Sequence, residues 1–177
     1  MLKKSKINFP IVIKPINEGS SIGVYICTKK NLNTNLKKLK KYNQILIEEY
    51  IPGREIQVAV MNNKALGAIE LKPKRKFYDY YAKYSSKAKT KHIMPAPLEH
   101  KKYKEVLSIA KTAHISLGCK GITRSDFRYN NKKFFLLEVN TQPGMTNLSL
   151  VPEIAVYKGI KFEDLVEWMV NDASCDR

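Results

Sequence analysis

Residues 122–146 read ITRSDFRYNNKKFFLLEVNTQPGMT, and this stretch decides the fold that the sequence predicts. Two runs with strand composition, residues 122–129 and 133–139, flank the turn pair Asn130-Asn131, so we expect a β-hairpin. The second run contains four consecutive apolar residues, Phe134 to Leu137, which we expect to be buried. A loop over residues 140–147 follows the hairpin.

The hairpin carries polar side chains that are candidates for a site. Asp126 lies on the first strand, and Glu138 and Asn140 lie two residues apart on the second, so these last two share a face. A carboxylate that follows a buried apolar run is costly unless it is paired or metal-bound. Three oxygen ligands at a strand end suit Mg²⁺. Two interpretations stay open at this point, a metal site and a salt bridge to Arg124.

The loop after the hairpin has a second possible role. Pro143-Gly144 forms a turn that can expose backbone N–H groups, and such groups beside Arg124 could cradle an oxyanion. A plain connecting loop fits the same residues.

Toward the N-terminus the sequence predicts a small sheet. A buried strand over residues 10–14 ends at Pro15, and Lys14 faces a loop rich in Gly and Ser, which suits phosphate, although a plain turn fits as well. Glu48 and Glu49 are adjacent on a strand and therefore point to opposite faces. The remaining elements expected here are a return strand at 24–27, a lysine-rich helix at 30–41, and strands at 44–51, 54–61 and 65–71.

The rest of the chain mixes helices with an irregular segment. Residues 72–97 are rich in Lys and Tyr and show no period, which indicates a functional or disordered segment. Residues 99–117 place apolar side chains on one helical face and end at Gly118. Two further helices are expected near 150–157 and 161–171. Helices together with antiparallel strand pairs indicate the α+β class.

The composition indicates a folded protein with an unusual charge. The chain has 177 residues, 44% of them apolar, and a formal net charge of +16. The charge lies in two blocks, residues 1–41 and 72–104, each with a net +9. Taken alone, this charge favours a polyanionic partner, and tyrosines among the lysines of the second block could stack bases. A basic nucleic-acid-binding module is therefore one hypothesis, but it explains neither Glu138 nor the Asn140 loop.

Other classes of protein are disfavoured. No run of 18 apolar residues exists, so we expect no membrane span. The basic N-terminus lacks an apolar segment behind it, so we expect no secretory signal. The three scattered cysteines indicate reduced thiols of a cytoplasmic protein.

Several motifs, in order along the chain, resemble the D-alanine–D-alanine ligase family of the ATP-grasp superfamily. They are Phe9-Pro-Ile-Val-Ile-Lys-Pro15, Glu18-Gly-Ser-Ser-Ile-Gly23, Ile47-Glu48, Phe77-Tyr-Asp-Tyr80, Ala82-Lys-Tyr84, Leu137 to Thr146 and Ser149-Leu-Val-Pro152. The resemblance implies an ATP-grasp fold in which two small α+β subdomains with mainly antiparallel sheets grip ATP. The expected divisions are residues 1–71, a lid over 72–97, and a catalytic subdomain over 98–177.

The resemblance also implies roles for individual residues. The ATP-binding set is Lys14, Glu48, Glu49, Tyr50, Ile51, Glu55, Phe77 and Lys83. Asp126, Glu138 and Asn140 would hold two Mg²⁺ ions, or Mn²⁺. Arg124 and the Gly144 N–H would stabilise the oxyanion, Ser20 and Tyr84 would help to place the substrate and close over it, and Ser149 and Leu150 would bind the second D-alanine.

The implied reaction is ATP-dependent formation of a D-alanyl-D-alanine dipeptide for peptidoglycan through an acyl phosphate. Another ATP-grasp carboxylate–amine ligase, a D-alanine–D-lactate ligase or a degenerate remnant are the alternatives. Tyr81 departs from the family pattern, and the family's N-terminal substrate domain has no counterpart here. We therefore expect a fragment that is inactive alone, with a homodimer or a separately encoded N-terminal domain as partner, and no nucleic acid or membrane partner.

Overall fold

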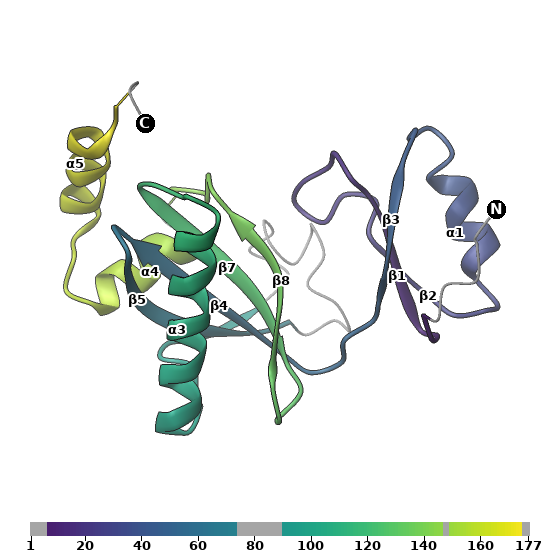
Figure 1. Ribbon diagram of the computed structural model, residues 1–177, viewed down its shortest axis with the longest axis horizontal. Coiled ribbons are helices and arrows are strands. Elements are labelled where there is room, and N and C mark those ends of the chain that lie inside the picture. Colours follow the sequence, from purple (N-terminus) through teal and green to yellow (C-terminus); the bar gives the residue numbers. More distant parts are fainter. Residues whose placement is uncertain (1–6, 74–89, 147–148, 175–177) are drawn as a thin grey trace. The chain divides into compact units, whose positions relative to one another are not determined.

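A computed structural model describes residues 7–73, 90–146 and 149–174. The chain divides into two compact units, each of which is made of two segments of the sequence (Figure 1). Unit 1 comprises Met1–Ile51 and Pro73–Thr90, and unit 2 comprises Pro52–Lys72 and Lys91–Arg177. The segment 1–71, which the sequence groups together, therefore contributes elements to both units.

Unit 1 contains a three-stranded antiparallel sheet in the order β2-β1-β3. The elements among its described residues are β1 (Ile11–Pro15), β2 (Tyr25–Cys27), helix α1 (Leu32–Lys38) and β3 (Ile45–Glu49). Alternate residues of β1 are buried, so Ile11 and Ile13 form a core with Cys27 and Leu39. The other face of the sheet carries Lys14, because successive strand residues point to opposite sides.

Unit 2 is built on a five-stranded antiparallel sheet in the order β6-β5-β4-β7-β8. The strands are β4 (Arg54–Met61), β5 (Lys64–Lys72), β6 (Lys91–Ile93), β7 (Ile122–Tyr129) and β8 (Phe134–Asn140). Three helices accompany them: α3 (His100–Ser116), α4 (Leu150–Tyr157) and α5 (Phe162–Asp172).

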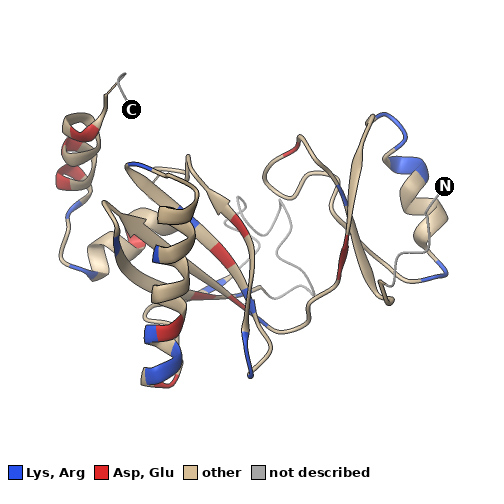
Figure 2. Cartoon of the chain, in the orientation of Figure 1, with Lys and Arg blue, Asp and Glu red and all other residues tan. Residues whose placement is uncertain are grey.

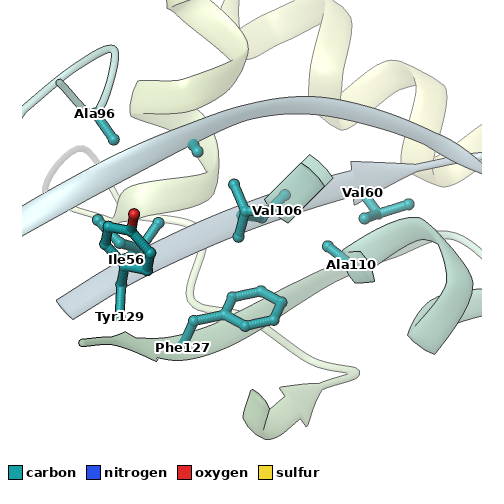
Figure 3. Close-up of a cluster of buried hydrophobic side chains, with 9 residues drawn as sticks. Ile56, Val60, Ala96, Val106, Ala110, Phe127 and Tyr129 are labelled. Atoms are coloured by element: carbon teal, nitrogen blue, oxygen red, sulfur yellow. The ribbon is translucent and has the colours of Figure 1, made fainter. Parts of the chain in front are cut away.

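Helix α3 covers one face of this sheet. Ile56 and Val60 on β4 and Phe127 on β7 pack with Val106 and Ala110 of α3 in a buried cluster (Figure 3). The alternation of β4 leaves its remaining side chains on the opposite face, toward which α4 packs against β4 and β5 (Figure 1). That opposite face is where the polar residues of the hairpin lie.

The structure confirms most of the expected elements of unit 2. The helix expected over 99–117 is present as α3, and the hairpin expected across Asn130-Asn131 is β7 and β8. Asn62 and Asn63 both have positive φ, of 45° and 60°, as a tight hairpin turn requires.

Three expectations were wrong. Leu136 and Leu137 are 41% and 45% exposed, because β8 is the edge strand of the sheet and a register irregularity opposite Asp126/Phe127 disturbs the alternation there. Glu138 is exposed too, so its carboxylate needs no partner to offset burial. The segment 72–97 is also not irregular throughout, since β6 lies within it.

The basic side chains are spread over the two units. Lys and Arg gather at both ends of α1 and in the first turns of α3, whereas α5 is acidic (Figure 2). Cys27 and Cys119 are free thiols, as expected. Along the described part of the chain, no helix combines the length and apolar character needed to cross a bilayer.

Candidate functional site

The hairpin of unit 2 brings four predicted site residues onto one face. Asp126 is the cross-strand partner of Glu138, and Arg124 is the partner of Asn140. Directly paired residues of an antiparallel ladder project on the same side, with Cβ atoms about 5 Å apart. The register therefore confirms the proximity that the spacing of Glu138 and Asn140 predicted.

Arg124 and Asp126 form a two-point ion pair. Arg124 Nε donates to Asp126 Oδ1 at 2.8 Å, and Nη2 donates to Oδ2 at 3.1 Å. Asp126 is 7% exposed, and the guanidinium compensates the burial of the carboxylate. The salt-bridge interpretation of the sequence thus holds for Asp126, whereas Glu138 lies exposed beside it.

The same residues offer a donor set that suits a hard cation. Two carboxylates and one amide oxygen are the ligand types that Mg²⁺ and Mn²⁺ take in proteins, with phosphates and water completing the shell. Within the described ranges, no group of three His, Cys, Asp or Glu side chains is arranged to hold a metal. The fit therefore rests on Asp126, Glu138 and Asn140 together with a ligand that supplies further oxygens.

Two hydrogen bonds join described residues at the two ends of the loop that follows β8. Asn140 Oδ1 accepts from the Gln142 N–H at 3.0 Å, and Ser149 Oγ accepts from the Thr146 N–H at 3.0 Å. Gly144 lies so close to Ser149 that a Cβ atom there would be 2.9 Å from Ser149 Oγ. Gly144 and Ser149, which the resemblance assigns to the oxyanion and to the second D-alanine, are thus neighbours.

Helix α4 begins directly after this loop. Ser149 is its N-cap residue, in an extended conformation and without a side-chain capping bond. The first N–H groups of such a helix lack intrahelical acceptors, and the positive end of the helix favours an anion. Leu150 opens the helix and is buried.

Glu55 lies at the start of β4 with a basic partner that the sequence reasoning missed. Arg128 Nη2 is 3.4 Å from Glu55 Oε2, and Arg128 Nη1 donates to the Gly53 carbonyl at 3.1 Å. The two residues are cross-strand partners. Pairing 54–61 with 122–129 is a long-range register that no local pattern in the sequence specifies.

In unit 1, Lys14 and Glu48, two candidates for contacts with the nucleotide, form an ion pair with each other. Lys14 Nζ and Glu48 Oε2 are 2.7 Å apart on the face of the sheet opposite the core. Glu49 is exposed at the end of β3, and the Tyr50 N–H donates to the Pro10 carbonyl at 3.2 Å, just before Ile51. Lys14 and Glu48 are thus close enough to contact one ligand.

The Gly/Ser loop of unit 1 adopts a left-handed backbone. Ser20, Ser21 and Gly23 have φ of 52°, 61° and 71°. The Ile22 N–H donates to the Gly19 carbonyl at 3.0 Å, which closes the turn. Successive left-handed residues turn N–H groups in a way that suits an anion.

Four residues singled out from the sequence lie outside the described residues: Phe77, Tyr81, Lys83 and Tyr84. The greater part of the predicted lid falls there as well.

Comparison with known proteins gives a consistent result. The family model described as "D-ala D-ala ligase C-terminus" matches residues 2–171. The D-alanine–D-alanine ligase of Pelagibacter ubique is 64% identical over 99% of this chain and 58% of its own length. That of Paramagnetospirillum magneticum is 46% identical over 94% of this chain and 56% of its own length. The chain thus spans a little over half the length of the curated relatives that it matches.

Solved structures agree with this result. A crystal structure of the D-alanine–D-alanine ligase of Bacillus anthracis has a TM-score of 0.80 and 32% identity, covering 93% of this chain and 54% of that one. A second structure of that enzyme, complexed with ATP, has a TM-score of 0.76, 30% identity and coverage of 93% and 53%. The α+β fold with antiparallel sheets is therefore that of ATP-grasp ligases, and the chain belongs to the D-ala D-ala ligase C-terminus family.

Proposed function

We propose that the chain supplies the ATP-binding and catalytic part of a ligase that joins two D-alanine molecules in the cytoplasm. The observation that carries the proposal is the register of β7 and β8, which gathers Arg124, Asp126, Glu138 and Asn140 on one face. A cation-binding donor set beside a guanidinium is what a phosphoryl-transfer site requires, because that chemistry depends on positioning and charge neutralisation.

Each set of residues has a part in this proposal. Asp126, Glu138 and Asn140 hold two Mg²⁺ or Mn²⁺ ions, which supply charge neutralisation at the phosphates when bound. Lys14 contacts a phosphate, Glu48 binds the adenine, and Glu55 binds the ribose. The backbone and side chains of Glu49, Tyr50 and Ile51 complete the adenine site, as they are expected to do in this family.

The reaction proceeds in two steps. The carboxylate of the first D-alanine attacks the γ-phosphorus of ATP, and the bond between this phosphorus and the β–γ bridging oxygen breaks. ADP departs, and the product of this step is an acyl phosphate. The amine of the second D-alanine then attacks the acyl carbon, and inorganic phosphate leaves after the amine has lost a proton. Arg124 and the Gly144 N–H face the oxyanion that develops in this second step.

The second D-alanine binds through its carboxylate at the beginning of α4. Ser149 supplies the hydroxyl, and the N–H groups at Leu150 and beyond supply donors. Ser20, on the left-handed loop of unit 1, helps to place the substrate. The partner of this chain is D-alanine together with a further domain or a second copy.

One similar structure makes the identity of the second, acceptor substrate a question for experiment. A structure of the VanG D-Ala:D-Ser ligase of Enterococcus faecalis has a TM-score of 0.80 and 28% identity, covering 94% of this chain and 50% of that one. A ligase of another acceptor would share every residue assigned above except those that contact the second substrate.

ADP release in a coupled assay tests the proposal, with D-alanine alone, D-alanine plus D-serine, and D-alanine plus D-lactate. The chain is assayed by itself and completed with the part of the P. ubique ligase that the match leaves uncovered. We expect D-alanine-dependent turnover from the completed protein and little from the chain alone. Release that is independent of D-alanine, or tight salt-sensitive RNA binding that ATP does not compete, would contradict the proposal and favour the nucleic-acid alternative.

A further inference from the structure

A short hydrogen bond joins β6 to α4 within unit 2. His92 Nδ1 lies 2.6 Å from Glu153 Oε2, and because a carboxylate can only accept, the imidazole donates. The side chains are 28% and 36% exposed. Neither residue belongs to the set assigned to ATP, metal or oxyanion, so the pair has no role in the proposal above.

The position of Glu153 in its helix links it to the acceptor site. Glu153 lies four residues after Ser149, and its N–H donates to the Ser149 carbonyl at 3.3 Å. Residues four apart lie on the same side of a helix, one turn from each other. Glu153 therefore carries its negative charge one turn from the helix end at which a substrate carboxylate is to bind.

This charge acts on the acceptor site in two opposing ways. A carboxylate in the first turn stabilises the helix through the macrodipole. A second anion arriving at the same helix end would be repelled by it, since both compete for the same positive potential. A basic or donor group that draws the Glu153 carboxylate away would reduce this repulsion.

His92 is a donor group of this kind, and the pairing of β6 with β5 fixes its position. It pairs with Leu71 in the β5–β6 register, and Leu71 is 2% exposed, so this part of β6 is held against a buried strand. Ser149 is in turn connected to Thr146 through the 2.8 Å contact between their hydroxyls. A line of contacts thus runs from β6 through Glu153 to the loop that carries Gly144.

We propose that His92 and Glu153 are positioning residues for the acceptor substrate. His92 fixes α4 against β6 and holds the Glu153 carboxylate away from the helix end that receives the carboxylate of the second D-alanine. The inference rests on the proposed function, because it concerns the acceptor subsite of that reaction.

Substitutions at His92 distinguish the contribution of its hydrogen-bond donor from that of its ring. They are made in the chain completed with the uncovered part of the P. ubique ligase, and dipeptide formation is measured against D-alanine and ATP. His92→Phe keeps a ring without a donor, and His92→Asn keeps an N–H near the Nδ1 position. We expect His92→Phe to raise the acceptor KM about threefold to fivefold, with the KM for ATP unchanged, and His92→Asn to restore the original value.

The charge on Glu153 provides the discriminating measurement. Glu153→Gln alone should lower the acceptor KM, and the acceptor KM of the double variant His92→Phe with Glu153→Gln should fall below that of His92→Phe alone. If the pair served only to hold α4 against β6, the double variant would instead have an acceptor KM as high as that of His92→Phe. His100→Phe is the matched control, because His100 is exposed at the start of α3.

The outcomes distinguish the two proposals. An unsubstituted protein that shows no D-alanine-dependent turnover overturns the proposed function and this inference with it. Turnover with an acceptor KM that is equal in the unsubstituted protein, His92→Phe and the double variant overturns the pairing alone. Thermal melts of every variant identify loss of fold, and Glu153→Gln, which keeps a hydrogen-bond acceptor, remains decisive if His92→Phe does not fold.

Discussion

Arg124 and Asp126 lie two residues apart on one face of β7, and the guanidinium holds both oxygens of the carboxylate. The sequence left two interpretations of Asp126 open, a metal ligand and a salt-bridge partner of Arg124, and the geometry links them. A cation that binds Asp126 must share it with Arg124 or displace the guanidinium toward the substrate. The ion pair is therefore a competitor for the metal in the absence of nucleotide.

Replacing Arg124 with Met should separate these effects. Asp126 would lose the partner that compensates its burial, so we expect Mn²⁺ to bind severalfold more tightly without nucleotide. Turnover should fall about 100-fold, because a preorganised oxyanion donor is lost. Electron paramagnetic resonance of free Mn²⁺ and ADP release measure the two quantities. Weaker Mn²⁺ binding in the variant would contradict the competition.

Glu138→Gln tests the metal assignment directly. Glu138 is exposed, so the substitution should not change the free energy of unfolding, yet Mg²⁺-dependent ATP binding should weaken by about tenfold or more because one anionic ligand is lost. Isothermal titration with and without Mg²⁺ measures it. Glu163→Gln, an exposed change in the first turn of α5, is the matched control. Equal affinity in the two variants would remove Glu138 from the site.

Local patterns were sufficient to predict the elements that carry the site. The hairpin around Asn130-Asn131 follows from composition and turn residues, and the two-residue spacing of Glu138 and Asn140 follows from strand geometry. Burial was not predictable in the same way. Leu136 and Leu137 form an apolar run that resembles a buried strand, but the order of the strands places them at the sheet edge.

Long-range pairings account for the rest of what the sequence did not predict. Arg128 meets Glu55 and His92 meets Glu153 across separations of 73 and 61 residues. A charge pattern identifies such residues as ionisable but gives no register between distant strands or between a strand and a helix. The same limit applies to β6, whose three residues pair with β5 although no local period marks them.

Gly23→Ala should destabilise unit 1. Its φ of +71° is unfavourable for a side chain, and a Cβ there would lie 2.9 Å from Pro15 Cγ and 3.2 Å from Leu39 Cδ2. We expect a loss of about 2 kcal/mol in the free energy of unfolding, from backbone strain and overpacking. Gly19→Ala is the control, since nothing lies within 4 Å of its Cβ position. Similar urea midpoints for the two variants would contradict this account.

The pair of Arg54 and Glu70 should be important for the stability of unit 2. Arg54 Nε and Nη2 donate to the two Glu70 oxygens at 2.9 and 2.8 Å, and Glu70 is 1% exposed. Arg54→Met would leave a buried charge and should cost about 3 kcal/mol, whereas Met at both positions should recover most of it. Urea unfolding measures both. Lys102→Ala, which breaks the more exposed pair with Glu105, should cost less than about 1 kcal/mol.

Buried His114 should make the stability of unit 2 depend on pH. Its side chain is 1% exposed and Nδ1 lies 2.8 Å from Thr123 Oγ1. Burial lowers the pKa of His114 below its ordinary value of 6.5. The unfolded chain therefore takes up a proton at a higher pH than the folded chain does, so this stabilisation is complete above pH 6.5 and is lost as the pH falls below it.

Urea unfolding at several pH values between 7.5 and 5 measures the loss. His114→Gln, which cannot titrate, should flatten the profile at a lower overall stability, while His100→Gln on the exposed end of α3 should leave it unchanged. A profile that is equally steep in His114→Gln would assign the acid sensitivity to other groups.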